Sequence, residues 1–198
     1  MSGNPYIHPT AEVAASAVIG DGTSIWNLAQ VREGARIGVD CIIGSGAYID
    51  AAVVIGDRCK LQNAVLVYHG FRLENGVFLG PGVMLLNDKT PRAINPDGSL
   101  KRAADWTVSQ GVVMEGAAVG GGSVVLPGVR LGRYCLVGAG SVVTKDVPDH
   151  GLVYGNPASL EGFVCRCGKR LADATAGAPR TVRCAHCGSE AHVRLEQA

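Results

Sequence analysis

An aliphatic residue returns at every sixth position over the first half of the chain, and a small residue follows four positions after most of them. An amphipathic helix repeats about every 3.6 residues and a two-faced strand every 2, so neither gives this period. A coil of short parallel strands does, because each strand adds one aliphatic side chain to a central stack. The series comprises Ile7, Val13, Ile19, Ile25, Val31, Ile37, Ile43, Ile49, Ile55, Leu61, Val67, Leu73, Leu79 and Leu85.

The composition favours a narrow, repetitive fold. The chain of 198 residues contains 28 glycines and only 5% aromatic residues. Glycine at the corners of a coil permits sharp bends that β-branched residues resist. Hydrophobic residues make up 47% and the formal net charge is +1, which excludes a disordered chain. So small a net charge gives no electrostatic reason to expect nucleic acid or an anionic membrane as a partner.

The chain also lacks the sequence signals of export and membrane insertion. The first residues, MSGNPYIHPTAEV, contain no basic segment followed by an apolar run. No apolar stretch approaches the roughly 18 residues that a membrane-spanning helix needs. We therefore expect a cytoplasmic protein without a membrane partner.

The repeat is interrupted once. It stops near residue 86, and the segment from about 86 to 106 follows no period. Loops of this length in compact domains are usually functional, and the prolines and glycine of the segment suit an ordered excursion. Between 106 and 119 the register is ambiguous by one residue. The resumed series comprises Val119, Val125, Leu131, Val137 and Val143.

Over about residues 7 to 160 the chain resembles the hexapeptide-repeat acyltransferases. The resemblance implies an all-β fold, a left-handed parallel β-helix in which three hexads make one triangular coil. It also implies that the loop at about 86–106 covers an active site between neighbouring subunits. We expect a homotrimer, because the flat faces of the coil expose backbone-rich strips and the loop has no obvious partner within its own subunit. We expect residues 1–162 to form this domain. A β-solenoid with only an assembly role remains the non-enzymatic alternative.

Three cysteines, Cys41, Cys59 and Cys135, occupy the small inward position of the hexads. A thiol at such a position packs as a small apolar group. We therefore interpret these three residues as part of the core.

Four further cysteines follow the repeat in two short clusters, CRC and CAHC, each followed by glycine. Four thiolates on two tight turns suit tetrahedral zinc, and a tail with almost no core needs such a cross-link. Disulfides are the alternative, and His186 or His192 could replace one thiolate. We expect residues 163–198 to form a small zinc-ribbon-like appendage with structural zinc. Its predicted ligands are Cys165, Cys167, Cys184 and Cys187.

Two kinds of enzyme share the hexapeptide repeat. A γ-type carbonic anhydrase needs three histidines around a catalytic zinc, but His8, His69 and His150 are far apart in the sequence. Acyl transfer from a coenzyme A thioester is the better interpretation.

The segment VGAGSVVTKDVPDHGLVYGNPA, residues 137–158, is similar to the terminal coil of coenzyme A-dependent members. In those proteins glycine-lined edges hold the pantetheine arm and a lysine meets phosphate. The similarity implies that acetyl-CoA is the co-substrate and that Gly138, Ala139 and Lys145 contact it.

Residues 60–93, KLQNAVLVYHGFRLENGVFLGPGVMLLNDKTPRA, resemble the enzymes that acetylate the 3-amino group of nucleotide-linked sugars. These include the UDP-2-acetamido-3-amino-2,3-dideoxy-glucuronate N-acetyltransferases of surface-polysaccharide synthesis. Phe71, Asn75 and Leu86 depart from the pattern of those enzymes, which bears on the sugar more than on the reaction. The matching positions are Tyr68, Gly70, Glu74, Gly80, Pro81, Asn87, Pro91 and Arg92.

The reaction needs little from the protein beyond positioning. A sugar amine has a pKa of roughly 8, so a useful fraction is neutral at pH 7. We expect Asn87 to orient this amine, with His69 as the alternative base or as a contact. Tyr68, Glu74 and Arg92 are the predicted substrate-binding residues.

The sequence therefore predicts a trimeric, acetyl-CoA-dependent N-acetyltransferase that acts on a nucleotide-linked amino sugar. The enzymatic alternative is an acyltransferase for a sugar hydroxyl or an amino acid.

Overall fold

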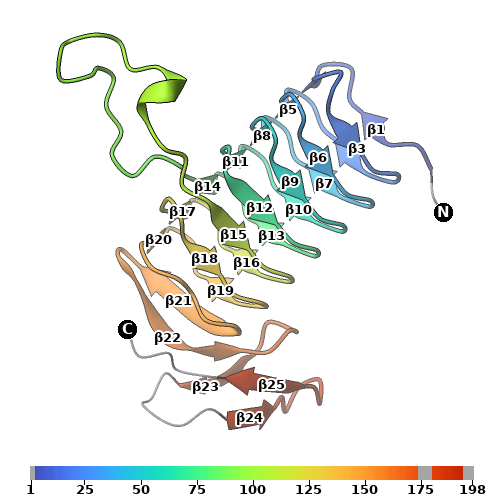
Figure 1. Cartoon of the computed structure of the whole chain (residues 1–198). Coiled ribbons are helices and arrows are strands. Elements are labelled where there is room, and N and C mark those ends of the chain that lie inside the picture. Colours follow the sequence, from blue (N-terminus) through green and yellow to red (C-terminus); the bar gives the residue numbers. More distant parts are fainter. Residues whose placement is uncertain (1–2, 174–179, 194–198) are drawn as a thin grey trace.

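The computed structural model describes residues 3–173 and 180–193. They form a parallel β-helix of short strands, from which one long loop projects and to which a small β-module is attached (Figure 1). The one helix in the described part of the chain is the three-residue 3-10 helix η1 (Ala103–Asp105). No described helix is long and apolar enough to span a membrane. The predicted all-β coil of hexapeptide repeats with an extruded loop is confirmed.

Three sheets form the sides of the β-helix, and each strand pairs with the strand one coil away. Sheet A continues beyond the β-helix into the C-terminal module. Its strands are β1 (Tyr6–Ile7), β4 (Ser24–Ile25), β7 (Ile42–Ile43), β10 (Lys60–Leu61), β13 (Phe78–Leu79), β16 (Ala118–Val119), β19 (Leu136–Val137), β21 (Gly151–Gly155), β22 (Ala158–Val164) and β23 (Arg170–Asp173).

The other two sides lie wholly within the β-helix. Sheet B consists of β2 (Glu12–Val13), β5 (Gln30–Val31), β8 (Tyr48–Ile49), β11 (Leu66–Val67), β14 (Met84–Leu85), β17 (Val124–Val125) and β20 (Val142–Val143). Sheet C consists of β3 (Val18–Ile19), β6 (Arg36–Ile37), β9 (Val54–Ile55), β12 (Phe71–Leu73), β15 (Gly111–Val113) and β18 (Arg130–Leu131). We name the turns between them the A–B, B–C and C–A corners.

The core is a stack of aliphatic side chains along the axis of the coil. In sheet A, Ile25 pairs with Ile43, Ile43 with Leu61 and Leu61 with Leu79, and all four are fully buried. The first coil is the open end of the stack, where Ile7 is 41% exposed. The six-residue period therefore places every inward aliphatic directly above its counterpart on the preceding coil.

Phe71 occupies a position that is small elsewhere in the repeat, and its partner across sheet C is Gly111. Phe71 is buried, and a Cβ at position 111 would overlap its ring. A glycine opposite a phenylalanine thus keeps the width of the coil constant. This pairing also fixes the register that the sequence left ambiguous between 106 and 119.

The extruded loop leaves the coil after β14 and returns at β15, so it spans residues 86–110 (Figure 1). It is a few residues longer than the predicted segment of about 86–106. Its two ends meet where the Ser109 amide donates a hydrogen bond to the Asn87 carbonyl, 3.1 Å. Near its tip, Ile94 and Leu100 form an isolated antiparallel bridge.

The C-terminal module begins where β22 turns back antiparallel on β21. The predicted boundary between residues 162 and 163 falls inside β22, so one strand joins coil and tail. Strands β24 (Arg180–Arg183) and β25 (Glu190–Val193) form a separate two-stranded sheet. The buried apolar residues in the described part of this module are few: Phe163, Ala191 and Val193 form its small core, and Val164, Cys165 and Cys184 are also buried.

Candidate active site and metal centre

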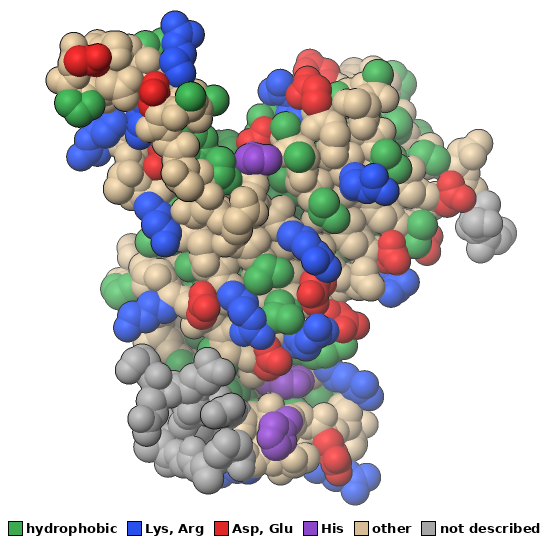
Figure 2. Space-filling model, in the orientation of Figure 1, with side chains coloured by type: hydrophobic (Ala, Val, Ile, Leu, Met, Phe, Trp, Pro, Cys, Tyr) green, Lys and Arg blue, Asp and Glu red, His purple; other side chains and the backbone are tan. Residues whose placement is uncertain are grey.

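The base of the extruded loop brings two predicted site residues together. His69 follows β11 and Asn87 follows β14, so both lie at the B–C corner on successive coils. Asp50, which follows β8, lies at the same corner one coil earlier. Figure 2 shows an open hollow between the projecting loop and the N-terminal coils. The corner from which the loop departs is therefore the candidate active site.

The imidazole of His69 is held in one orientation by the coil below it. Its Nδ1 lies 2.7 Å from the carbonyl oxygen of Ala51. A carbonyl only accepts, so Nδ1 carries the proton and donates. In the neutral ring the lone pair is then on Nε2, which has no hydrogen-bond partner among the described residues. The ring thus presents a fixed proton acceptor.

Asn87 bridges the same corner from the next coil. Its Nδ2 donates to the backbone carbonyl of His69, 2.9 Å. This bond fixes the carboxamide, and Oδ1 has no hydrogen-bond partner in the described part of the chain. A carboxamide oxygen held in this way can accept a hydrogen bond from an incoming N–H or O–H group.

Asp50 supports the backbone on which His69 and Ala51 sit, and sequence reasoning missed it. Its Oδ2 accepts from the His69 amide at 3.0 Å, and its Oδ1 accepts from the Ala51 amide at 2.8 Å. The Tyr48 hydroxyl also donates to Oδ1, 3.1 Å. The available signal was the coil length of 18 residues, which stacks positions 50, 68–69 and 87 at one corner.

Gly70 lets the returning loop pass close to His69. Its φ of +98° lies in the left-handed region that favours glycine. A Cβ at this position would lie 2.6 Å from Cγ1 of Val108 and 2.7 Å from the carbonyl oxygen of Ser109. The glycine therefore sets how tightly the loop closes over the corner.

The structure brings Tyr68 into this site but places Arg92 and Glu74 elsewhere. The Tyr68 ring packs against Tyr48 with centroids 5.8 Å apart. Arg92 lies on the exposed part of the loop, and its Nη1 donates to the Pro91 carbonyl at 2.8 Å. Glu74 follows β12 and lies at the C–A corner, where Arg133 pairs with it at 3.5 Å. The contact of Glu74 with the sugar stays a prediction, because Glu74 does not lie at the corner that holds His69.

The three predicted coenzyme A residues lie at two corners. Gly138 and Ala139 follow β19 at the A–B corner, where the carbonyl of Gly138 accepts from the hydroxyls of Ser123 and Ser141. Lys145 follows β20, so it is exposed at the B–C corner, two coils beyond Asn87. With strands about 4.8 Å apart, that places its backbone about 10 Å along the edge. Lys145 therefore shares an edge with Asn87, whereas the other two do not.

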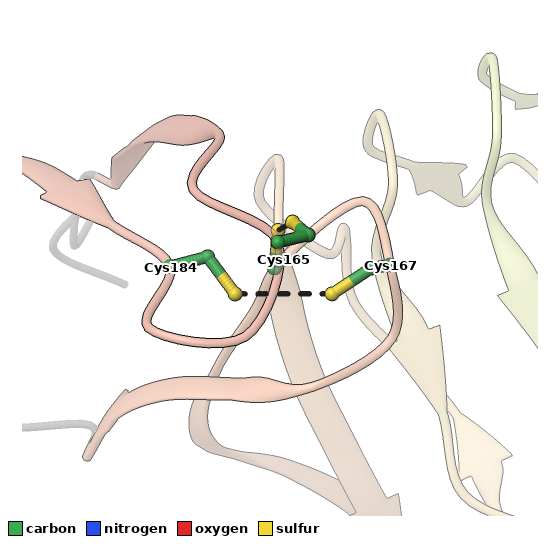
Figure 3. A group of neighbouring side chains, drawn as sticks. Cys165, Cys167 and Cys184 are labelled. Carbon is green, nitrogen blue, oxygen red and sulfur yellow. Dashed lines mark hydrogen bonds between the residues drawn. The ribbon is translucent and has the colours of Figure 1, made fainter.

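The four tail cysteines meet in space, as the sequence predicted. Cys165 and Cys167 come from the turn after β22, and Cys184 and Cys187 come from the turn after β24. Figure 3 shows Cys167 and Cys184 pointing toward each other across the gap between these turns, with Cys165 behind them. All four Sγ atoms lie within 4.8 Å of one another.

The geometry of this thiol cluster fits a tetrahedral metal ion. Zinc bound at about 2.3 Å by four sulfurs sets neighbouring sulfurs about 3.8 Å apart. The Sγ atoms of Cys165 and Cys187 are 3.5 Å apart, and those of Cys167 and Cys184 are 3.8 Å apart. The Ser189 hydroxyl beside Cys187 lowers the pKa of that thiol to about 6, which favours the thiolate that binds metal.

The remaining cysteines and histidines are not part of this cluster. Cys41, Cys59 and Cys135 are buried in the coil, as predicted. Burial raises the pKa of the Cys135 thiol to about 12, which keeps it neutral. His192 is exposed and its ring contacts the Thr181 hydroxyl, while His186 is exposed on the second cysteine turn. Neither histidine is needed to complete a four-sulfur site.

Family models match the repeat on both sides of the loop. The model described as bacterial transferase hexapeptide (six repeats) matches residues 16–51 and 111–145. A second model, hexapeptide repeat of succinyl-transferase, matches residues 34–69.

Two curated relatives match parts of the chain. A dTDP-3-amino-3,6-dideoxy-alpha-D-galactopyranose 3-N-acetyltransferase from Aneurinibacillus thermoaerophilus is 52% identical over 60 residues, 30% of this chain and 31% of that protein. A galactoside O-acetyltransferase from Lactococcus lactis is 38% identical over 82 residues, 41% of this chain and 38% of that protein. The aligned segments thus span less than two fifths of either relative.

Among solved structures, a UDP-N-acetylglucosamine acyltransferase from Bacteroides fragilis superposes with a TM-score of 0.65. The match covers 81% of this chain and 61% of that one, at 18% identity. At this identity the likeness concerns the fold alone, and it agrees with the parallel β-helix described above.

Proposed function

We propose that this hexapeptide-repeat protein, a homologue of nucleotide-sugar 3-N-acetyltransferases, transfers an acetyl group from acetyl-CoA to the 3-amino group of a nucleotide-linked amino sugar. The observation that carries the proposal is the pair of open acceptors at the loop base, Nε2 of His69 and Oδ1 of Asn87. The identity to the dTDP-amino-sugar enzyme supports the same acceptor class.

The two side chains suit the chemistry of amide formation. The Oδ1 atom of Asn87 accepts a hydrogen bond from one N–H of the substrate amine. This bond aims the lone pair of the amine nitrogen at the thioester carbonyl. The C–N bond then forms and the C–S bond breaks. The proton released by the nitrogen passes to Nε2 of His69 and ends on the coenzyme A thiol. Asp50 keeps this corner rigid through its bonds to the His69 and Ala51 amides.

A trimer completes the site in this proposal. At the loop tip, Ile94 is 56% and Leu100 is 60% exposed, which favours a neighbouring subunit as their packing partner. On sheet B the outward residues Leu66, Met84, Val124 and Val142 give a largely apolar, flat side. We further propose that the protein is cytoplasmic, because acetyl-CoA and nucleotide sugars are made there.

The tail, residues 163–198, is proposed as a separate module that binds one structural zinc ion. When bound, zinc joins the two cysteine turns that this small core cannot hold by packing alone. Residues 174–179 and 194–198 of this predicted module lie outside the described residues.

A second candidate acceptor is a sugar hydroxyl. The identity to a galactoside O-acetyltransferase favours it, and a histidine with an open Nε2 can take a proton from an O–H group. Incubation with acetyl-CoA and a panel of nucleotide-linked amino sugars and neutral sugars, read by mass spectrometry, distinguishes the two. We expect one added acetyl group on the 3-amino sugars only. Products on hydroxyl acceptors alone would replace the proposal, and no product with any acceptor would favour an assembly module.

His69→Ala tests whether this histidine is a base or a contact. As a base it should contribute about 100-fold or more to kcat, and its loss should abolish the acid limb of the pH profile. A contact should contribute less and leave that limb in place. His8→Ala is the control, since among the described residues the His8 ring bonds only to Thr10, at the other end of the coil.

A further inference from the structure

A charged groove runs along the C–A corner, on the side of sheet C opposite the candidate active site. It consists of two adjacent cavities of about 280 and 270 Å³. Asn75 and Glu115 line both, so the cavities form one continuous depression. Figure 2 shows basic and acidic side chains gathered over the C-terminal coils beside the C-terminal module.

Arginines outnumber acids in this groove. Arg133 forms ion pairs with both glutamates, at 2.8 Å to Glu115 and 3.5 Å to Glu74. The other three guanidinium groups, those of Arg58, Arg72 and Arg166, have no hydrogen bond or ion pair to any described residue. Four arginines against two glutamates leave the groove with excess positive charge and unused N–H donors.

An aromatic hydroxyl adds a further unused donor. The ring of Tyr134 stacks on His150 with centroids 5.6 Å apart and an interplanar angle of 20°. Its other side rests against Gly116, where a Cβ would overlap the ring. The ring is therefore fixed in the wall of the groove, and its hydroxyl bonds to no described residue.

The groove depends on both regions of the molecule. Arg58 and Arg72 come from the middle coils, whereas Arg166 lies between the zinc-ligand candidates Cys165 and Cys167 in the tail. A closed metal site would fix the turn that carries Arg166. The tail thus supplies one wall of the depression.

We propose that this groove is a second ligand site that binds a small phosphorylated molecule through Arg58, Arg72 and Arg166. A guanidinium group donates paired hydrogen bonds to phosphate oxygens. A phosphorylated ligand therefore suits a set of free arginines better than a ligand with a single carboxylate would. Each cavity is large enough for a diphosphate. Tyr134 adds a neutral donor beside the bound group.

This site is distinct from the candidate acetyl-transfer corner. His69 and Glu74 stand at opposite ends of strand β12, roughly 16 Å apart along an extended chain. No residue that lines the groove takes part in the hydrogen bonds of His69 or Asn87. Occupation of the groove therefore needs no part of the transfer chemistry.

Calorimetric titration of the full chain with inorganic pyrophosphate tests the proposal, using wild type and the double variant Arg58→Gln/Arg166→Gln. We expect the double variant to bind at least about tenfold more weakly, because two charge-assisted contacts are lost. Arg36→Gln is the matched control, since Arg36 faces outward on sheet C but does not line the groove. Tyr134→Phe, which keeps the ring packing, should weaken binding by less than the double variant.

Three outcomes would overturn the proposal. Equal pyrophosphate affinity in wild type and the double variant, with zinc content and thermal unfolding unchanged, would remove the arginines from any ligand site. If the double variant lost as much kcat/KM for acetyl transfer as it lost pyrophosphate affinity, the groove would belong to the transfer site instead. Stronger binding of citrate than of pyrophosphate would contradict the phosphorylated ligand class.

Discussion

The β-helix and the C-terminal module hold their shape in different ways. The β-helix buries a continuous stack of aliphatic side chains, and residues such as Ile43 and Leu61 are fully buried with equivalents on the coils above and below. The described part of the module has a small core cluster of Phe163, Ala191 and Val193, and its two turns meet at four thiols. Stability in the coil is therefore spread over many equal contacts, whereas the module concentrates it in one cluster.

The cysteines of the two regions show the same difference. In the coil, Cys135 fills a small inward position and stays neutral. In the module, Cys167 and Cys187 are exposed and lie within reach of two other thiols. A cysteine side chain thus packs in the apolar core of the coil, whereas in the module it is a candidate metal ligand.

The largest predicted effect is on the module. Cys167→Ser/Cys187→Ser should lower the zinc content from about one ion per chain to near none, because two of four ligands are gone. Amide hydrogen exchange in β24 and β25 should then become fast, while exchange in the coil stays slow. Cys135→Ala is the control and should retain zinc. Stoichiometric zinc in the double variant would refute the four-sulfur site.

A smaller effect is expected from a cavity in the middle of the coil. Leu79→Ala should lower the free energy of unfolding by about 2–5 kcal/mol, since Leu79 is fully buried between Leu61 and Val119. Ile7→Ala, in the open first coil, should cost less than about 1 kcal/mol. Chemical denaturation measures both. Similar losses at the two positions would contradict the open first coil, in which Ile7 is 41% exposed.

A buried hydroxyl gives a smaller effect again. The Thr23 hydroxyl donates to the Gly38 carbonyl at 2.7 Å and accepts from the Cys41 amide at 2.9 Å. Thr23→Val should cost about 1–3 kcal/mol, because it leaves both partners unsatisfied inside the coil. Ser24→Ala, which removes an outward hydroxyl on the next residue, should change the free energy of unfolding by less than about 0.5 kcal/mol. An equal cost for both would contradict this role.

The smallest effect should be that of zinc loss on acetyl transfer. His69 and Asn87 are held by Ala51, Asp50 and Ser109, all of them in the coil or at the base of its loop. We expect kcat/KM of Cys167→Ser/Cys187→Ser to stay within about twofold of wild type, apart from any change in protein yield. A tenfold loss in soluble, trimeric protein would show that the two regions are coupled.

Much of the coil could be predicted because its information is local and periodic. The six-residue series defines every inward position, and the spacing of the four tail cysteines predicted that they form one cluster. The exact return of the loop could not be predicted, because it depends on Gly111 facing Phe71 across sheet C. That contact joins residues on opposite sides of a long aperiodic segment.

The candidate site was predicted in part for the same reason. Asn87 and His69 were predicted and lie together at one corner, but Asp50 was missed because its hydrogen bonds depend on the 18-residue stacking of corners. Glu74 was assigned to the substrate through the resemblance of residues 60–93 to sugar acetyltransferases, although β12 carries it to the opposite corner. The arginine groove combines residues from coil and tail, so no single stretch of sequence reveals it.

We propose that the break in the coil at Asn87 places an acceptor amine beside acetyl-CoA. The most direct test is kcat/KM of Asn87→Ala for the nucleotide-linked amino sugar, with coenzyme A affinity measured on the same protein. We expect kcat/KM to fall roughly 10- to 150-fold, equivalent to one lost orienting hydrogen bond, while coenzyme A affinity stays near wild type. Asn63→Ala, which removes an asparagine that bonds the neighbouring coil at the A–B corner, should keep its activity. Near-wild-type kcat/KM in a correctly folded Asn87→Ala protein would contradict this role of Asn87.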